Sequence, residues 1–393
     1  MAIGTKVGAM KEKTKIVHAG RDPKSNHGAV NPPVYHASTI LYPTYEDLKH
    51  PKTRVQYGRR GTPTVFALED AIMALEGGAG CAIVPSGLNA CTTALLAFLS
   101  AGDHLLMPDS AYGPTRNFCN TFLKRMGVET TFYDPTIGAD IAALMTDQTK
   151  VVFVESPGSL TFEVQDIPAI ADVAHANGAK VILDNTWASP LFFKPYEHGV
   201  DVSIQAATKY VVGHADTMLG TITANEECWP LVHAAHGQLG LCAGPDDIFL
   251  ALRGLRTLDV RLKQHMKQGI ELATWLGERD EVSHVLHPAL PSHPQHDIWA
   301  RDFLGASGLF SVVLNPVEED ALAAMLDGLE LFGMGYSWGG FESLVVPSNP
   351  ARYRTATTWD VPGRLLRFHA GLEDMDDLKA DLDKGLARLK AAG

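Results

Sequence analysis

The chain has 393 residues and a formal net charge of −12, from 33 lysines and arginines against 45 aspartates and glutamates. With 46% hydrophobic and 20% charged residues it can bury a large core, and its length indicates about two or three domains. The negative charge disfavours nucleic acid and anionic membrane surfaces as partners, so the composition favours an acidic globular enzyme.

The beginning of the chain and its cysteines indicate the compartment. The first residues are polar and lack the apolar core of a secretory signal, and the most apolar stretch, residues 94–99, is far too short to span a bilayer. The five cysteines are scattered without a CxxC pair, which favours buried reduced thiols over a disulfide framework or a thiolate metal site. We therefore expect a cytoplasmic protein that does not bind membranes.

Residues 1–60 form the first expected unit. They are loop-like with weak periodicity, which indicates an arm that packs on something else rather than a domain. A helix is expected next: Thr62 can cap it, Pro63 suits its first position, and Gly77-Gly78 ends it.

Short apolar runs then alternate with helical stretches. This alternation predicts a doubly wound α/β domain over residues 61–254, with strands at 81–84, 104–107, 151–155, 180–184 and 221–224 and a helix at 168–177. Beyond residue 254 the pattern changes, and it predicts a smaller α+β domain over 255–393, with helices at 255–275, 321–329 and 374–389 and a strand at 310–314.

Two residues of the large domain suggest chemistry. Asp184 ends an apolar strand, where ligands bind in open α/β sheets, although it could also cap the next helix. Lys209 lies among small and apolar residues, and a desolvated lysine is a nucleophilic amine; the alternative is a lysine at a strand end with its head in water. Together they suit pyridoxal 5'-phosphate, whose aldehyde the lysine would hold while the aspartate keeps the ring nitrogen protonated.

Such a cofactor needs a phosphate site and a ring contact. Ser86, Gly87 and Leu88 follow a strand and open a helix, where backbone N–H groups attract anions, although a plain turn has the same pattern. Thr208 could add a hydroxyl donor. Tyr112 follows another strand and could stack on the ring, or simply pack in its loop.

Three further features could bind anions. Tyr57 and Arg59 offer a phenol and a guanidinium that suit phosphate, unless their loop is merely solvated. Arg367 lies in an apolar strand, and it would need the carboxylate of either an amino-acid substrate or a core residue. The segment 336–343 is a glycine-rich aromatic loop.

Other ligands are disfavoured. The pairs His233/His236 and His293/His296 lack a third ligand at a suitable spacing, so we interpret them as surface or loop histidines and expect no metal. No GxGxxG or GxxxxGK[ST] motif is present, which disfavours dinucleotides and nucleoside triphosphates.

With these residues in place, the sequence resembles the cystathionine-metabolism family of pyridoxal-phosphate enzymes, from about Lys13 to the C-terminus. The resemblance implies an aspartate-aminotransferase-like fold (fold type I), with a mainly parallel sheet in the large domain. It is carried by eight stretches, at residues 57–62, 76–81, 155–159, 184–187, 205–210, 253–257, 336–340 and 371–374.

The resemblance also implies roles for the candidate residues. Three residues would be catalytic. Lys209 would hold the cofactor, Asp184 would pair with its ring nitrogen, and Tyr112 would stack on its ring. The phosphate would be bound by Ser86, Gly87, Leu88 and Thr208, and from a neighbouring subunit by Tyr57 and Arg59. The substrate would be bound by Arg367, Ser337 and Trp338 at its α-carboxylate, with Tyr336 and Tyr57 beside it. A homotetramer, built as a dimer of dimers with shared active sites, is therefore expected, and residues near Arg116 and Asn117 are candidates for the distal end of the substrate.

Four departures from the family's pattern favour one reaction. Many relatives have Ser where this chain has Ala206 and Asn where it has Ser159; methionine γ-lyases have Cys at the position of Pro114, and γ-cleaving relatives often have Glu at that of Tyr336. These differences favour β-elimination of L-cystathionine to homocysteine, pyruvate and ammonia. Two alternatives stay open: γ-elimination or γ-replacement by the same apparatus, and a PLP-binding regulatory protein without turnover.

Overall fold

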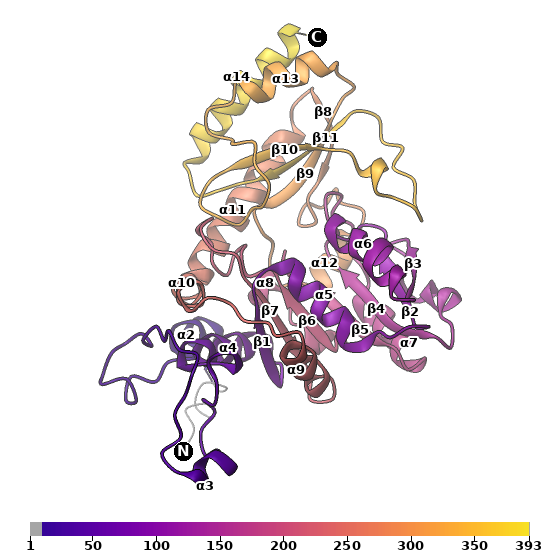
Figure 1. Cartoon of the computed structure of the whole chain (residues 1–393). Coiled ribbons are helices and arrows are strands. Elements are labelled where there is room, and N and C mark those ends of the chain that lie inside the picture. Colours follow the sequence, from indigo (N-terminus) through magenta and orange to yellow (C-terminus); the bar gives the residue numbers. More distant parts are fainter. Residues whose placement is uncertain (1–9, 393) are drawn as a thin grey trace.

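The computed structural model describes residues 10–392, which form two sheets with helices around them (Figure 1). The larger sheet has seven strands in the spatial order β1-β7-β6-β5-β4-β2-β3, and only β7 runs antiparallel to its neighbours. Its strands are β1 (Gly80–Val84), β2 (His104–Pro108), β3 (Glu129–Tyr133), β4 (Thr149–Glu155), β5 (Lys180–Asp184), β6 (Val202–Gln205) and β7 (Gly220–Ala224).

Helices cover both faces of this sheet, as the alternation of strands and helices predicts. Val181 and Leu183 of β5 belong to one hydrophobic core, with α4 and α7, whereas Ile182 between them belongs to another, with α5 and α9. Because each central strand is buried on both sides, it is a continuous apolar run. The helices of this part are α4 (Pro63–Glu76), α5 (Gly87–Phe98), α6 (Gly113–Phe118), η2 (Cys119–Leu123), η3 (Gly138–Leu144), α7 (Ile167–Ala176), α8 (Ser189–Phe192), η4 (Pro195–His198) and α9 (Trp229–Gln238).

The smaller sheet is antiparallel, in the order β10-β11-β9-β8, and lies above the larger one in Figure 1. One face of it packs on α11, α13 and α14 around Phe310 and Phe368, which are almost fully buried. Its strands are β8 (Val282–Leu286), β9 (Leu309–Leu314), β10 (Leu344–Ser348) and β11 (Arg364–His369). The helices from residue 245 onward are α10 (Pro245–Leu255), α11 (Leu258–Gly277), α12 (His296–Asp302), α13 (Glu319–Asp327), η5 (Pro350–Arg352) and α14 (Met375–Ala392).

Most expected elements are present within one to three residues of their predicted bounds. The helix expected over 255–275 begins three residues later, at Leu258, because α10 ends at Leu255 and the helical hydrogen bonding is interrupted at Arg256-Thr257 before α11 begins. The Arg256 side chain donates hydrogen bonds to the carbonyl oxygens of Ile16 and Ala19, at 2.6 and 2.9 Å. The break therefore coincides with an anchor for the beginning of the chain.

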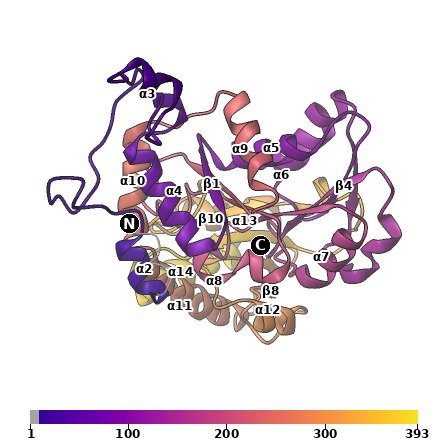
Figure 2. The same cartoon turned by 90° about the horizontal axis from the view of Figure 1, so that it is seen from below.

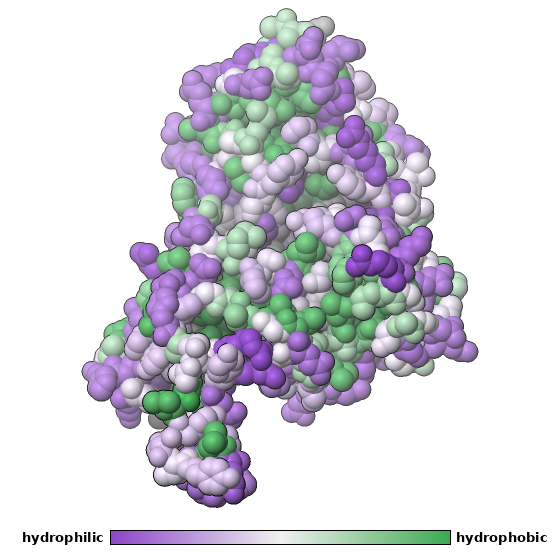
Figure 3. Space-filling view, in the orientation of Figure 1, coloured by the Kyte–Doolittle hydropathy of each residue, from purple (hydrophilic) through white to green (hydrophobic). Residues whose placement is uncertain are grey.

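Residues 10–60 contain three short helices that the sequence did not indicate: α2 (Glu12–His18), α3 (Tyr45–Lys49) and η1 (Gly58–Arg60). Ile16 of α2 is only 2% exposed and belongs to the main core. Residues further on project from the body, with α3 on the projecting segment (Figures 1 and 2), and leave Leu41 86% and Tyr45 71% exposed. Figure 3 shows hydrophobic side chains among the polar ones on this projecting segment.

None of the helices in the described part of the chain combines the length and the hydrophobicity needed to cross a bilayer. All five cysteines are free. Four are buried, as expected, whereas Cys242 is exposed, so the expectation of a buried thiol is wrong for Cys242.

Candidate active site

Lys209 lies four residues beyond the end of β6, in a turn that closes with a hydrogen bond from its N–H to the Ala206 carbonyl. Its Nζ donates to the Ser337 hydroxyl at 2.5 Å and lies 5.4 Å from the centre of the Trp338 ring. Burial, helped by the positive charge of Arg367, lowers the pKa of Lys209 to about 8. A useful fraction of this amine is therefore unprotonated near neutral pH, as a nucleophile or base requires.

The lowered pKa predicts how the free amine responds to pH. In the cofactor-free protein, the rate at which Lys209 reacts with an amine-selective acylating reagent should rise with pH and reach half of its maximum near pH 8. Above that pH the amine has lost its proton and is nucleophilic, whereas a surface lysine still gains reactivity up to about pH 10.4. Peptide mass spectrometry after timed labelling measures the labelling rates of Lys209 and of surface lysines at each pH. A half-maximal rate for Lys209 only near pH 10 would contradict the prediction.

Asp184 ends β5 and lies beside Glu155, its partner in the register of β4 and β5. Oδ1 accepts hydrogen bonds from the Thr186 backbone, at 3.1 Å, and hydroxyl, at 2.5 Å, whereas Oδ2 has only the Cys91 thiol at 3.7 Å. Burial raises the pKa of Asp184 despite these donors. The Oδ2 side of this carboxylate therefore lacks a strong donor, and a protonated ring nitrogen would provide one.

Glu155 is a buried residue that our sequence reasoning did not select. Its Oε2 accepts the backbone N–H of Tyr112 at 2.7 Å, which fixes the start of α6 and with it the tyrosine. Burial and the neighbouring Asp184 raise the pKa of Glu155 well above its usual value. Like Asp184, Glu155 is a carboxylate at the end of an apolar strand, and this signal is visible in the sequence.

The expected phosphate corner is formed by the beginning of α5 and the turn after β6. A Cβ atom on Gly87 would lie 2.4 Å from the Ala206 Cβ, so only glycine permits this approach of the two backbones. Ser86 caps α5 by accepting the Asn89 N–H at 3.1 Å, and its hydroxyl proton stays available for an anion. The Thr208 hydroxyl, in contrast, donates to the Leu219 carbonyl at 3.1 Å, so its one proton is already engaged. Leu88 is 37% exposed in the first turn of α5.

The aromatic loop before β10 contacts Lys209 through Ser337 and Trp338. Arg367 of β11 donates from Nη2 to the Ser337 carbonyl at 3.1 Å, and the Trp338 ring packs on Tyr210 with centroids 5.4 Å apart. Tyr336 is 90% exposed and Tyr112 is 44% exposed, and both are close enough to Arg367 to affect its pKa. Arg367 forms no salt bridge with a carboxylate within residues 10–392, and burial lowers its pKa. A carboxylate of the substrate would supply the missing partner.

Tyr57 and Arg59, which are expected to reach the phosphate in a neighbouring subunit, lie at the start of η1 and within it. Arg59 donates from Nη1 to the Gly237 carbonyl of α9 at 3.0 Å, and Tyr57 is 48% exposed. Arg116 is engaged by Asp109 at 3.0 Å and by the Tyr353 carbonyl at 2.5 Å. It therefore ties the C-terminal segment to the large sheet and is not free to bind the distal end of a substrate.

Asp109 completes this tie at the end of β2. Its carboxylate accepts backbone N–H groups at 2.8 to 3.1 Å from three successive residues, Thr355, Ala356 and Thr357. These bonds and Arg116 hold the pKa of Asp109 below its usual value. The loop that carries Tyr112 is thus fixed to the C-terminal part of the chain.

The paired histidines and the surface hollows lie outside this site. His236 Nε2 donates to the Ile83 carbonyl, 2.9 Å away. His293 lies in the loop before α12, one of the two expected settings, although it is only 4% exposed. Among residues 10–392, no group of three or more potential metal ligands is present.

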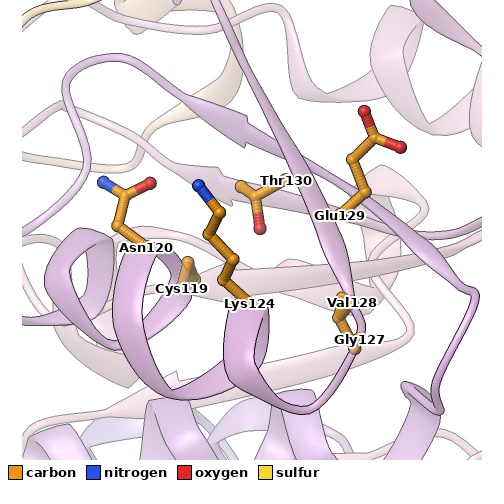
Figure 4. A pocket seen from close by; sticks show the side chains of 7 residues that line it. All are labelled: Cys119, Asn120, Lys124, Gly127, Val128, Glu129 and Thr130. Atoms are coloured by element: carbon orange, nitrogen blue, oxygen red, sulfur yellow. The ribbon is translucent and has the colours of Figure 1, made fainter.

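A hollow of about 420 Å³ lies beside the edge strand β3, lined by Cys119, Asn120, Lys124, Gly127, Val128, Glu129 and Thr130 (Figure 4). It contains none of the candidate residues.

These side chains fit pyridoxal phosphate on two independent grounds. The close approach at Gly87 leaves the N-terminal N–H groups of α5 next to the turn that carries Lys209, where a phosphate can bind. The buried carboxylate of Asp184 needs a cationic donor, and the protonated ring nitrogen of this cofactor is one.

Comparison with known proteins agrees with this fit. A family model described as "Cys/Met metabolism PLP-dependent enzyme" matches residues 13–387. The chain is 52% identical to a putative cystathionine β-lyase of Rhizobium johnstonii, over 96% of both chains, and 46% identical to the cystathionine β-lyase MetC of Escherichia coli, over 96% of this chain and 98% of that one. The crystal structure of a cystathionine γ-synthase from Xanthomonas oryzae superposes with a TM-score of 0.90 at 33% identity, covering 98% of this chain and all of that one. The chain therefore belongs to the Cys/Met metabolism family of PLP-dependent enzymes, with the fold type I architecture.

Proposed function

We propose that the protein cleaves L-cystathionine by β-elimination, giving homocysteine, pyruvate and ammonia. The observation that carries this proposal is the meeting of Lys209 Nζ, the Ser337 hydroxyl and the Arg367 guanidinium beside Asp184. It places a basic amine next to a carboxylate-binding arginine, which is the arrangement an α-amino acid needs. The names of relatives at 44–52% identity, all cystathionine β-lyases, support the choice of substrate and bond.

The chain's own residues would divide the work as follows. Arg367 and the Ser337–Trp338 segment bind the substrate α-carboxylate and orient the Cα–H bond toward Lys209. Pyridoxal phosphate, when bound, supplies the electron sink that stabilises negative charge at Cα, and Asp184 keeps its ring nitrogen protonated. Lys209 takes the proton from Cα and returns a proton to the sulfur that leaves Cβ as homocysteine. Water then completes the release of the three-carbon fragment as pyruvate and ammonia.

A pKa near 8 suits Lys209 to both proton transfers. A free lysine, with a pKa near 10.4, would be almost fully protonated at neutral pH and could not act as a base. The lowered pKa leaves both forms of the amine populated, so the same group can accept a proton and later donate one.

The test is an assay of the products formed by the purified, cofactor-loaded protein. Pyruvate and homocysteine from L-cystathionine support β-elimination. Formation of 2-oxobutyrate and cysteine would instead support γ-elimination, which the likeness to a γ-synthase keeps as the second candidate. Bound cofactor with neither pair of products would favour a regulatory protein without turnover.

We also propose that the active form is a homotetramer, a dimer of dimers, in which Tyr57 and Arg59 reach the phosphate bound in a neighbouring subunit. Two observations support this: the exposed apolar side chains of the projecting segment, such as Leu41 and Tyr45, and the exposure of Tyr57. Buried against a second copy, these side chains would leave water.

Shared sites predict recovery of activity in mixtures of inactive variants. A Tyr57→Phe, Arg59→Ala double variant and a Lys209→Ala variant should each be inactive or nearly so, because each lacks one part of every site. After unfolding and joint refolding, half of the random dimers are mixed and hold one intact site, so about a quarter of the wild-type activity should return. No recovery, with mixed dimers demonstrated by mass spectrometry, would contradict shared sites.

A further inference from the structure

His369 is a buried ring close to the site that the proposed reaction does not use. It ends β11, two residues beyond Arg367, and is only 1% exposed. Its ring lies 5.1 Å from that of His265 and 6.1 Å from that of Tyr210, the residue after Lys209. This histidine therefore lies in a buried cluster with the ring of the residue that follows Lys209.

The hydrogen bonds of His369 determine which ring nitrogen carries its proton. Nε2 accepts the buried backbone N–H of Gly339 at 3.0 Å, so it cannot be protonated. Nδ1 lies 3.1 Å from the Glu342 carbonyl oxygen, so it must be the donor. Burial and the neighbouring His265 hold the pKa of His369 well below its usual value, which keeps the ring in this neutral form.

The accepted N–H belongs to the point at which the aromatic loop touches Lys209. Gly339 has φ +86°, and a Cβ atom there would lie 2.9 Å from the Lys209 carbonyl carbon and the Tyr210 nitrogen. Ser337, which also has a left-handed backbone (φ +78°), is held two residues earlier by Arg367. A serine stays in this conformation only where its surroundings fix it. One strand, β11, therefore holds both ends of the segment 337–339.

We propose that His369 is a positioning residue: by accepting the Gly339 N–H it holds the segment 337–339 against Lys209 and so fixes the site for the substrate α-carboxylate. This inference rests on the proposed function and deepens it. Arg367 alone would hold Ser337 from one side. Without the acceptor, the buried Gly339 N–H would lack a partner, and the segment would move to recover one.

Two substitutions separate the two hydrogen bonds. In His369→Gln the side-chain oxygen can reach the place of Nε2 and accept the Gly339 N–H, whereas in His369→Asn the shorter amide can replace only Nδ1 and donate to Glu342. His265→Asn is the matched control, because it removes the same volume from the same cluster and keeps the donor that bonds to the Ala370 carbonyl.

We expect His369→Asn to raise KM for L-cystathionine roughly ten-fold, with kcat changed less than about three-fold, because one hydrogen bond that orders the binding segment is lost. His369→Gln and His265→Asn should stay within about three-fold of the wild-type KM. Hydrogen exchange of the cofactor-loaded protein gives a readout independent of turnover: the Gly339 amide should exchange faster in His369→Asn and stay protected in the other two.

The proposal is overturned if His369→Asn leaves KM and exchange unchanged, if His369→Gln is impaired as much, or if His265→Asn has the same effect, which would indicate lost packing alone. If His369→Asn does not fold, His369→Gln still tests the proposal. A raised KM or a faster-exchanging Gly339 amide in that variant overturns it. Should the wild-type protein not cleave cystathionine, the proposed function fails on its own, while the exchange measurement still tests the role of His369.

Discussion

Replacing Lys209 by alanine is expected to lower the rate of cystathionine cleavage by about four orders of magnitude or more. Residues 10–392 offer no second amine at this place: the side chain of Lys209 is buried, its Nζ contacts the Ser337 hydroxyl, and the neighbouring cation, Arg367, is a guanidinium. A proton at Cα would have no base, and the leaving sulfur would have no acid. The rate of pyruvate formation, measured with lactate dehydrogenase and NADH, checks the prediction.

Two controls separate the chemistry of Lys209 from its charge and from folding. Lys209→Arg keeps the positive charge but cannot lose its proton at working pH, so it should be as inactive as the alanine variant. Lys150→Ala, at an exposed position of β4, should retain the wild-type rate. A Lys209→Ala protein that binds pyridoxal phosphate and still turns over at the wild-type rate would exclude Lys209 as the acid–base group.

The sequence predicts the large sheet well where burial leaves a simple pattern. Strands β4 and β5 are buried on both faces, so VVFVE and KVILD are continuous apolar runs that only a central parallel strand explains. It fails at β3 and β8, which are only partly buried and mix polar with apolar residues, and it also misses β6, although that strand is buried throughout. These strands exist because a neighbouring strand offers hydrogen bonds, and that partner is invisible in the local pattern.

The candidate site shows the same division between local and long-range information. Asp184 and Lys209 were found because each breaks a local pattern, a charge at the end or in the middle of an apolar stretch. The contact of Lys209 with Ser337, 128 residues away, has no local signature. His369 was missed for the same reason: its bond to Gly339 depends on β11 and the aromatic loop meeting in space, 30 residues apart.

The Asp184→Asn substitution should lower the activity of the protein and raise the thermal stability of its cofactor-free form. The amide has the same shape and can still accept the hydroxyl and the backbone N–H of Thr186, so the turn after β5 should persist. It has no negative charge to keep a ring nitrogen protonated, however, and we expect the rate of cystathionine cleavage to fall by about three orders of magnitude. The wild-type carboxylate, meanwhile, is buried beside Glu155 with a raised pKa, so in the cofactor-free protein it is a source of instability.

The cofactor-free Asp184→Asn protein should therefore unfold at a higher temperature than the cofactor-free wild type, although it is almost inactive once loaded. Cys91→Ala is the matched control, because it removes only the weak thiol contact to the same carboxylate and should cost less than about 1 kcal/mol in the barrier to turnover. Calorimetry of the cofactor-free proteins and the pyruvate assay of the loaded ones measure the two effects. If Asp184 meets a cationic ring nitrogen, the Asp184→Asn protein loses activity and gains thermal stability. If both its activity and its thermal stability fall, Asp184 serves the turn after β5 rather than the cofactor.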